Sequence, residues 1–359
     1  MTEQSATITP AIVLQLMRMR ALTRGIDAAD FDAVAQSVTD WPDWIGAWSK
    51  LGERDGGLAA SCENHSWRLS ASSAHLRSGA AYHLAKIMSV TDDEAYRTAT
   101  LNSVSAVRRG LELANEDFAR LEVPFDSYRI FGNLRIPPHV QAPPLVLFIG
   151  GADSVKEEFN FWEREFLARG AATLSMDGPG QGEAGFDLRI RPDYEVAVTA
   201  MLDAVAGEAH ELDVSSVGAV GMSMGGYYSL RAAAFEPRIK AVVNNSGHYD
   251  LGASWDAGHV IPLLAAKLLW NFGASSLEEA HEMARALTLR PIVQRIQVPV
   301  LTLIGEADPL LDPEVDGEEL TKDLPDGTLR SFPGGDHCLT NRIPQHAGPS
   351  ADWLLEQLR

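Results

Sequence analysis

The chain has 359 residues, of which 45% are hydrophobic, and its formal net charge is −19 at pH 7. This length allows one large core and a smaller second domain. The negative charge works against binding to nucleic acid or to an anionic membrane surface, so we expect no nucleic-acid and no membrane partner.

The first residues, MTEQSATITP, contain no basic stretch followed by an apolar one, so no signal peptide is expected. The apolar runs are far shorter than the roughly 20 residues that a membrane-spanning helix needs. Cys62 and Cys338 lie far apart without metal-ligand spacing, which favours free thiols in a reducing compartment. We therefore expect a cytoplasmic protein, and we expect it to be a homodimer.

Residues 1–117 show helical spacing of their apolar positions and few strand signals. The pattern predicts helices over 11–22, 30–38, 42–62 and 73–90. We expect this region to form an all-helical N-terminal domain that serves as a cap.

From about residue 118, short apolar strands alternate with helices. Strands are predicted over 144–150, 171–177, 216–222, 239–245, 299–305 and 328–334. Their apolar runs are unbroken, which indicates a sheet that is covered on both faces and therefore parallel. Residues 128–137 are expected to form a hairpin with its turn at Gly132. The pattern predicts a doubly wound, mostly parallel α/β domain over 118–359.

Two other segments are expected to be helical. Residues 155–169 should form a helix with Ser154 as N-cap and Gly170 just past its end. Residues 252–291 are too many for a simple crossover between strands, so they should hold two or three extra helices. We expect these helices to form a lid over the strand ends.

A G-x-S-x-G motif, GMSMG, spans residues 221–225 between a predicted strand and a predicted helix. This is the setting of a nucleophile elbow, a sharp turn that exposes a serine at the end of a strand. The small flanking residues let the neighbouring backbone approach without clashes. Ser223 is therefore the predicted nucleophile.

A serine hydroxyl needs a base to become a good nucleophile, and in this fold the acid and then the histidine follow the serine. Asp308 and His337 each follow a predicted strand, so both lie at the sheet edge where open α/β sheets place their sites. We expect them to complete a catalytic triad with Ser223. Glu306 and Asp312 remain alternatives for the acid.

Backbone amides should bind the oxyanion that forms when the serine attacks a carbonyl group. One predicted donor is Met224, directly after the nucleophile, and the other is Ala152, in the loop after the strand over 144–150. Gly151 should let that loop approach the substrate closely.

The residues after the strand over 239–245 are candidates for the wall of a substrate pocket. His248, Tyr249 and Trp255 could face bound substrate, and they could equally pack structurally.

Several motifs together resemble the α/β-hydrolase superfamily over residues 118–359. They are GMSMGG (221–226), DGPGQG (177–182), GEADPL (305–310) and GGDHC (334–338). The helical N-terminal domain, GNLRIP (132–137) and GGADSVKEE (150–158) look like the 2,6-dihydroxypseudooxynicotine hydrolase group, which includes fungal polyketide-shortening hydrolases. This second resemblance covers nearly the whole chain.

The resemblance implies hydrolysis of a carbon–carbon bond next to a ketone, in a small 1,3-diketone-like or acyl-arene substrate, with no metal and no organic cofactor. It also singles out Asp153, since the nicotine-degrading members carry a glutamate in the matching loop. Asp153 is therefore a candidate for protonating the leaving enolate, and the alternative is a turn residue before Ser154. An esterase, lactonase or amide hydrolase with the same triad is the alternative function.

Overall fold

The computed structural model describes residues 9–87, 93–207 and 212–359. Contacts within the chain divide it into two units, Met1–Ala114 and Asn115–Arg359. No helix within the three described ranges has both the length and the apolarity that a membrane span requires.

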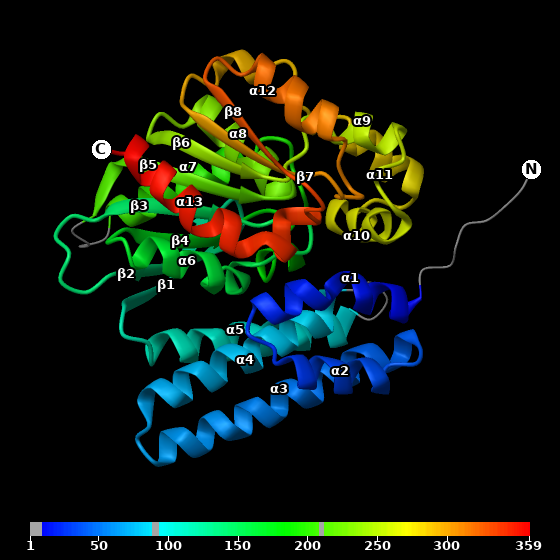
Figure 1. The fold of residues 1–359 in the computed structure, drawn as a ribbon, viewed down its shortest axis with the longest axis vertical. Helices are drawn as coiled ribbons and strands as arrows, with labels where there is room; N and C mark the ends of the chain where they lie inside the picture. Colours follow the sequence, from blue (N-terminus) through cyan, green and yellow to red (C-terminus); the bar gives the residue numbers. More distant parts are fainter. Residues whose placement is uncertain (1–8, 88–92, 208–211) are drawn as a thin grey trace, which may run out of the picture. The chain divides into compact units, whose positions relative to one another are not determined.

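The first unit is built of helices alone in its described part (Figure 1). They are α1 (Pro10–Thr23), α2 (Ala28–Ser37), α3 (Trp41–Asn64), α4 (Arg68–Ile87) and α5 (Asp93–Glu112). The helix α3 starts with a capping box. The side chain of Asp40 accepts the backbone N–H of Asp43, and the side chain of Asp43 accepts the backbone N–H of Asp40. The fully buried Trp44 donates from its indole to the carbonyl of Leu84 at 2.9 Å, which fastens α3 to α4.

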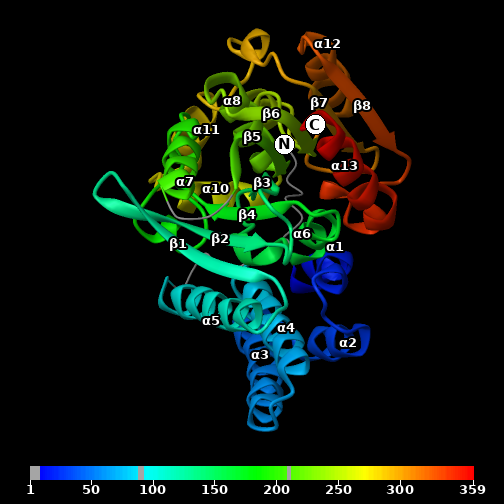
Figure 2. The ribbon, with the colours of Figure 1, turned by 90° about the vertical axis from the view of Figure 1, so that its left-hand side faces the viewer.

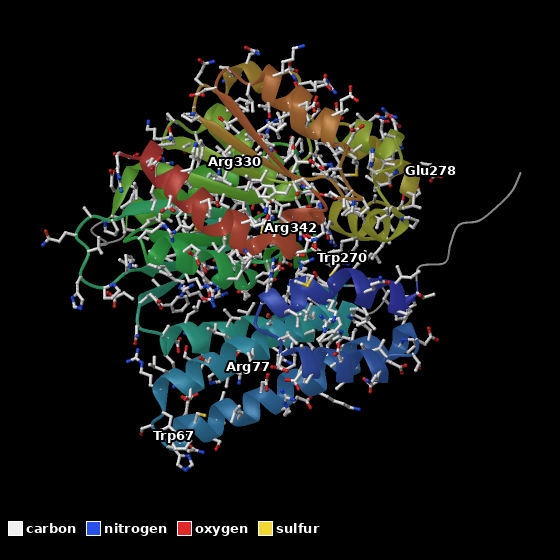
Figure 3. The ribbon with its side chains drawn as sticks, viewed as in Figure 1. Trp67, Arg77, Trp270, Glu278, Arg330 and Arg342 are labelled. Atoms are coloured by element: carbon white, nitrogen blue, oxygen red, sulfur yellow. The ribbon has the colours of Figure 1, made fainter. Side chains whose placement is uncertain are left out.

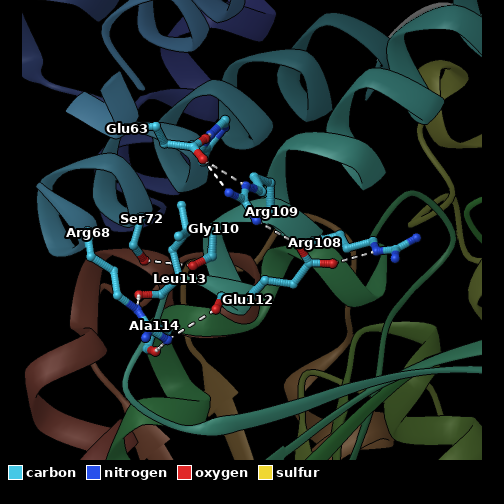
Figure 4. A network of polar contacts seen from close by, with 10 residues as sticks. Glu63, Arg68, Ser72, Arg108, Arg109, Gly110, Glu112, Leu113 and Ala114 are labelled. Atoms are coloured by element: carbon cyan, nitrogen blue, oxygen red, sulfur yellow. Dashed lines mark hydrogen bonds and ion pairs between the residues drawn. The ribbon is translucent and has the colours of Figure 1, made fainter. Parts of the chain in front are cut away.

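Polar contacts join the ends of α3, α4 and α5 (Figure 4). The guanidinium of Arg68 donates to the carbonyls of Leu113 and Ala114 at 3.0 and 2.9 Å. These carbonyls follow the last turn of α5. At such a helix end the carbonyl groups have no N–H partner within the helix, and a positive charge is favourable. Arg109 of α5 also pairs with Glu63 of α3. The first unit is thus held by polar contacts at its surface as well as by its apolar core.

The second unit contains an eight-stranded sheet with the order β1-β2-β4-β3-β5-β6-β7-β8 (Figures 1 and 2). The strands are β1 (Asp117–Phe125), β2 (Tyr128–Ile136), β3 (Pro144–Ile149), β4 (Ala172–Asp177), β5 (Asp213–Met222), β6 (Ile239–Asn245), β7 (Val300–Gly305) and β8 (Gly327–Phe332). The pairs β1–β2 and β2–β4 are antiparallel and the others are parallel. The expected mostly parallel α/β domain is therefore confirmed.

Helices cover both faces of this sheet. They are α6 (Asn160–Leu167), α7 (Glu195–Gly207), α8 (Met224–Phe235), α9 (Leu251–Asp256), α10 (Pro262–Phe272), α11 (Leu277–Ala284), α12 (Leu320–Asp323) and α13 (Ile343–Gln357). One buried apolar cluster includes residues of α7, α8, α10 and α11, and the other includes residues of α6 and α13. Along the sequence, the three helices α9 to α11 lie between β6 and β7, where extra helices were expected. That they form a lid remains a prediction.

Short helical turns complete the second unit. They are η1 (Lys156–Glu158), η2 (Ala184–Phe186), η3 (Val293–Arg295), the π-helical η4 (Pro313–Glu319) and η5 (His337–Arg342). The turn η5 begins with His337, the predicted base of the triad, so this residue lies in irregular backbone and not in a regular helix or strand.

The expected hairpin within residues 128–137 is wrong. These residues lie in the single strand β2, in which Gly132 pairs with Leu121 of β1. The turn precedes β2 instead, at Asp126, which has a positive φ of 50°. A short polar side chain tolerates this conformation, whereas Gly132 leaves room for Met201 packed above it.

The helix expected over 155–169 is shorter than predicted, and Ser154 is not its N-cap. The chain first forms η1, and α6 then starts after Phe159 without a side-chain cap. The reason is a tertiary contact: the backbone N–H of Lys156 donates to Asp177 Oδ1 at 2.8 Å, which holds the chain to the end of β4.

A group of buried charges, here called the Lys156 cluster, surrounds this contact. It consists of Lys156, Glu157, Asp177, Glu183 and Arg120. The ammonium of Lys156 has no exposed surface and lies 3.1 Å from Asp177 and 2.6 Å from Glu183. Burial opposes its charge, but the carboxylates around it outweigh burial and raise the pKa of Lys156. The cluster ties the loop after β3 to β1 and β4.

Replacing the central cation should therefore destabilise the fold. Lys156→Met removes the partner of several buried carboxylates, and breaking such a buried pair typically costs about 3–5 kcal/mol. The measurement is the midpoint of thermal and urea unfolding. The control Lys240→Met removes an exposed lysine that contacts the carbonyl of Pro237, and it should change stability by less than about 0.5 kcal/mol. Equal midpoints for the two variants would contradict the assigned role of Lys156.

Candidate active site

The turn between β5 and α8 holds Ser223 in a strained conformation, with φ 56° and ψ −129°. The neighbouring glycines make this turn possible. A β-carbon on Gly221 would lie 2.1 Å from the carbonyl oxygen of Gly225, and one on Gly225 would lie 2.0 Å from that of Ile149. Real atoms cannot come so close, so both positions require glycine. This is the sharp turn expected of a nucleophile elbow.

The three residues predicted to form a triad meet at the carboxyl ends of the strands. Oγ of Ser223 lies 2.9 Å from Nε2 of His337, and Nδ1 of His337 lies 2.8 Å from Oδ2 of Asp308. The Asp308 side chain is fully buried, while that of His337 is 23% exposed. The backbone N–H of Leu310 donates to the other carboxylate oxygen of Asp308 at 2.9 Å, which fixes its orientation.

His337 and Asp308 shift each other's pKa. Burial disfavours the charged form of His337, but the Asp308 carboxylate outweighs it and holds the pKa of His337 well above its ordinary value. Burial likewise disfavours the charge on Asp308, and the neighbouring imidazolium outweighs it, so the pKa of Asp308 is lowered. Such a pair stabilises the imidazolium that forms when a histidine accepts a serine proton.

Of the two alternative acids, Glu306 is exposed and Asp312 caps a helical turn. The carboxylate of Asp312 accepts the N–H of Glu314 and caps the π-helical turn η4. Asp336, next to the histidine, accepts the hydroxyl of Thr340 at 2.6 Å and the N–H of Asn341. Of these carboxylates, it is Asp308 that contacts His337.

The loop after β3 passes directly beside the serine. A β-carbon on Gly151 would lie 2.8 Å from Cβ of Ser223, so the backbone touches the turn as expected. Ala152 follows in the same loop, and its carbonyl accepts a hydrogen bond from Asn271 of α10 at 2.5 Å. Met224 is the first residue of α8, where N–H groups have no partner within the helix. The two predicted oxyanion donors therefore come from segments that meet at Ser223.

Asp153, the next residue of this loop, lies near a buried lysine of α10. Lys267 is only 6% exposed, and its ammonium lies 4.4 Å from the centre of the Trp270 ring, which Figure 3 labels. Burial lowers the pKa of Lys267 to about 8, against the opposing influence of the Asp153 carboxylate. Sequence reasoning singled out Asp153 and missed Lys267, whose one signal is a lone cation in the apolar stretch PLLAAKLLWNF (262–272).

The three candidates for the pocket wall have different surroundings. His248 is buried, and burial together with the charge of His337 lowers its pKa to about 3, so its ring is neutral beside the triad. Tyr249 donates from its hydroxyl to Asp323 of α12 at 2.7 Å. Trp255 stacks on His281 of α11, with 5.0 Å between ring centres. His248 thus lies near enough to His337 for that charge to lower its pKa, whereas Tyr249 and Trp255 contact Asp323 and His281.

Across the described ranges, no group of three or more His, Cys, Asp or Glu residues is placed to hold a metal ion. Cys62 and Cys338 are both buried free thiols. The site offers an alcohol beside an imidazole, two carboxylates and an amine.

Comparisons with known proteins agree with this architecture. A family model described as "Esterase FrsA-like" matches residues 41–359. The 2,6-dihydropseudooxynicotine hydrolase of Paenarthrobacter nicotinovorans is 31% identical over 277 residues, which cover 74% of this chain and 72% of that protein. The alpha/beta hydrolase xenA of Xenoacremonium sinensis is 29% identical over 286 residues, 74% of this chain and 66% of the relative.

A solved structure supports the same conclusion. The crystal structure of the 2,6-dihydroxy-pseudo-oxynicotine hydrolase matches with a TM-score of 0.86 at 27% identity, over 95% of each chain. Some fungal hydrolases are matched over little more than half of their length, 54% and 52% in two cases. The expected fold class and the resemblance drawn from the motifs are confirmed.

The carboxylate of Asp308 should control the proton affinity of His337. In Asp308→Asn the charge that raises the pKa of His337 is gone while its burial remains, so this pKa should fall below its ordinary value. An NMR titration of the His337 ring measures it. Asp336→Asn is the matched control, because this neighbouring acid binds Thr340 and the backbone instead, and it should leave the titration nearly unchanged. An unaltered pKa in Asp308→Asn would refute the coupling.

Proposed function

Because this chain belongs to the FrsA-like esterase family and is an α/β hydrolase, we propose that it acts through a serine nucleophile. In this proposal Ser223 attacks the substrate, His337 is the general base and Asp308 orients the histidine. The observation that carries it is the unbroken pair of hydrogen bonds from Ser223 through His337 to Asp308. The cytoplasmic location and the homodimer expected from the sequence remain part of the proposal.

The reaction proceeds through an acyl-enzyme. Oγ of Ser223 attacks the carbonyl carbon while Nε2 of His337 accepts the hydroxyl proton. The amides of Met224 and Ala152 stabilise the oxyanion, and one such donor is typically worth about 3 kcal/mol. Collapse of the intermediate breaks the bond to the leaving group, which departs with the electron pair and takes a proton. Water, deprotonated by His337, then releases the carboxylic acid and regenerates Ser223.

For the bond that is cleaved, we propose a carbon–carbon bond next to a ketone in a small molecule. The support is the resemblance of the motifs and a 31% identical relative named as a 2,6-dihydropseudooxynicotine hydrolase. When the substrate carries a second carbonyl, the electron pair of the broken bond forms an enolate, whose carbon must gain a proton. Asp153 lies two residues after Gly151, and its carboxylate interacts electrostatically with the ammonium of Lys267, which suits the handling of this anion.

An ester, lactone or amide hydrolase is the second candidate function. The observation in its favour is that the matching family model is described as an esterase. The same serine, histidine and oxyanion donors would form the same acyl-enzyme, and an alkoxide or phenolate would leave in place of an enolate. The two functions differ in what the leaving group needs.

The nucleophile can be tested directly. Ser223→Ala should fold normally but lose hydrolysis by about 10³-fold or more, because it removes the hydroxyl that Nε2 of His337 contacts. Labelling by a fluorophosphonate, followed by mass spectrometry of the modified peptide, should place the adduct on Ser223 and fail in the variant. Ser229→Ala, a buried serine on α8 that donates to the carbonyl of Gly226, is the control and should retain labelling. A folded Ser223→Ala variant with most of its activity would disprove the triad.

The type of bond cleaved can be tested through Asp153. Asp153→Asn keeps the size of the side chain but removes its charge and its proton exchange. It should slow cleavage of a β-diketone by about 10²-fold, since general acid–base assistance is typically worth this much, and it should barely affect an aryl ester, whose phenolate leaves unaided. The measurement is kcat/KM on both substrates. Equal losses on both, or none on the diketone, would favour the esterase.

A further inference from the structure

The side chain of Gln181 makes an unusual number of contacts for a buried amide. It is 2% exposed and lies in the DGPGQG loop (177–182) after β4. Its Oε1 accepts from the backbone N–H of Gly178 at 3.1 Å and from the hydroxyl of Tyr194 at 2.5 Å. Its Nε2 donates to the carbonyl of Gly150 at 2.5 Å and contacts that of Gly151 at 3.4 Å. Both ends of the amide are thus satisfied, and its orientation is fixed.

The two carbonyls that Gln181 binds belong to the loop that carries Ala152. On its other side this loop touches the nucleophile turn: a β-carbon on Gly151 would lie 2.8 Å from Cβ of Ser223, and one on Gly225 would lie 2.7 Å from the carbonyl oxygen of Gly150. The peptide units just before Ala152 are therefore enclosed between Gln181 and the start of α8. A shift of Gln181 would move the amide of Ala152 relative to Ser223.

Tyr194 extends this support to the nucleophile helix. While its hydroxyl donates to Gln181, its ring stacks on Tyr228 of α8 with 4.0 Å between centres and 13° between planes. Burial raises the pKa of Tyr194 well above its ordinary value, so the hydroxyl stays a donor at every working pH. One side chain therefore links the amide of Gln181 to α8, which supplies the amide of Met224.

The remaining residues of the loop make this arrangement possible. A β-carbon on Gly178 would lie 2.5 Å from the Tyr194 hydroxyl, and one on Gly182 would lie 2.0 Å from Oδ2 of Asp177. Asp177 itself binds the backbone N–H of Lys156, at the far end of the loop after β3. The DGPGQG loop thus holds the loop after β3 at two points, on either side of Ala152 and Asp153.

We propose that Gln181 is a positioning residue of the oxyanion hole, which holds the Ala152 amide in place through the carbonyls of Gly150 and Gly151. This rests on the proposed function, in which that amide stabilises the oxyanion formed at Ser223. A preorganised donor acts only when it lies within a few tenths of an ångström of its place, so the effect of Gln181 falls on the transition state rather than on substrate binding.

The test is Gln181→Glu, which keeps the acceptor for Gly178 and Tyr194 but replaces the donor by a negative oxygen facing two carbonyls. We expect kcat on an aryl ester to fall by about 10- to 100-fold with KM within about threefold, by analogy with the loss of an oxyanion donor. Phosphonylation of Ser223 by a fluorophosphonate should slow in parallel. The pH at which kcat/KM reaches half its maximum should not move, because Asp308 and His337 are untouched.

Two further variants keep the test decisive. Tyr194→Phe retains the ring stacking and removes one hydrogen bond to Gln181, so it should lower kcat in the same way but less. Gln294→Glu is the matched control, since the exposed Gln294 also donates to a backbone carbonyl, that of Asp323 at 2.6 Å, and it should leave kcat unchanged.

The outcomes separate this proposal from the one on which it rests. If fluorophosphonate fails to label Ser223 in the unaltered protein, the serine mechanism itself is wrong. If labelling succeeds and a folded Gln181→Glu variant keeps kcat within about threefold, the positioning role is refuted. It is also refuted if both Gln181→Glu and Tyr194→Phe lose activity only in proportion to a lowered Tm, as a purely structural role would require.

Discussion

The close approach of α8 to the end of β3 is the constraint on which the rest of the site depends. Gly225 lies so near the carbonyl of Ile149 that no side chain fits between them. This contact joins the turn of Ser223 to the loop of Ala152 without any intervening side chain. The distance between Ser223 and the loop after β3 is then set by two backbones, which are less variable than side-chain rotamers.

The other residues of the site are arranged around this contact. His337 and Asp308 lie in the loops after β8 and β7, and each shifts the pKa of the other. Behind the loop after β3 lie two polar side chains, Gln181 from one side and Asn271 of α10 from the other. The loop after β3 is therefore held by hydrogen bonds from segments that are far apart in the sequence.

Much of the fold could be predicted because the strands are marked by unbroken apolar runs, and the chain order of Ser223, Asp308 and His337 singled out three residues that meet in the structure. The predicted strands over 144–150 and 239–245 agree with β3 and β6 to within one residue. The prediction of a hairpin within 128–137 was wrong because the sequence of β1 does not look like a strand. It contains Pro124 and the charged residues Arg120 and Glu122, as an edge strand can. Without β1 as a partner, Gly132 resembled a turn.

The supporting residues could not be predicted, because their chemistry arises only from tertiary placement. Lys267 lies in an apolar helix, where a lone lysine usually extends its ammonium to solvent, and its burial beside Asp153 depends on how α10 packs. The amide of Gln181 carries no sequence signal beyond its glycine neighbours. Local pattern thus singles out candidate reacting groups but not the residues that pack around them.

The Lys156 cluster has a consequence for how this protein can change over evolutionary time. Its cations and carboxylates pair with one another with little exposure to water, so the benefit of each residue depends on the identity of the others. A lineage could exchange the cluster for apolar packing, which is often no less stable, but only by crossing intermediates with an unbalanced buried charge. Any substitution that removes one charge of the cluster would leave its partners unbalanced, so changes within the cluster should be strongly coupled to one another.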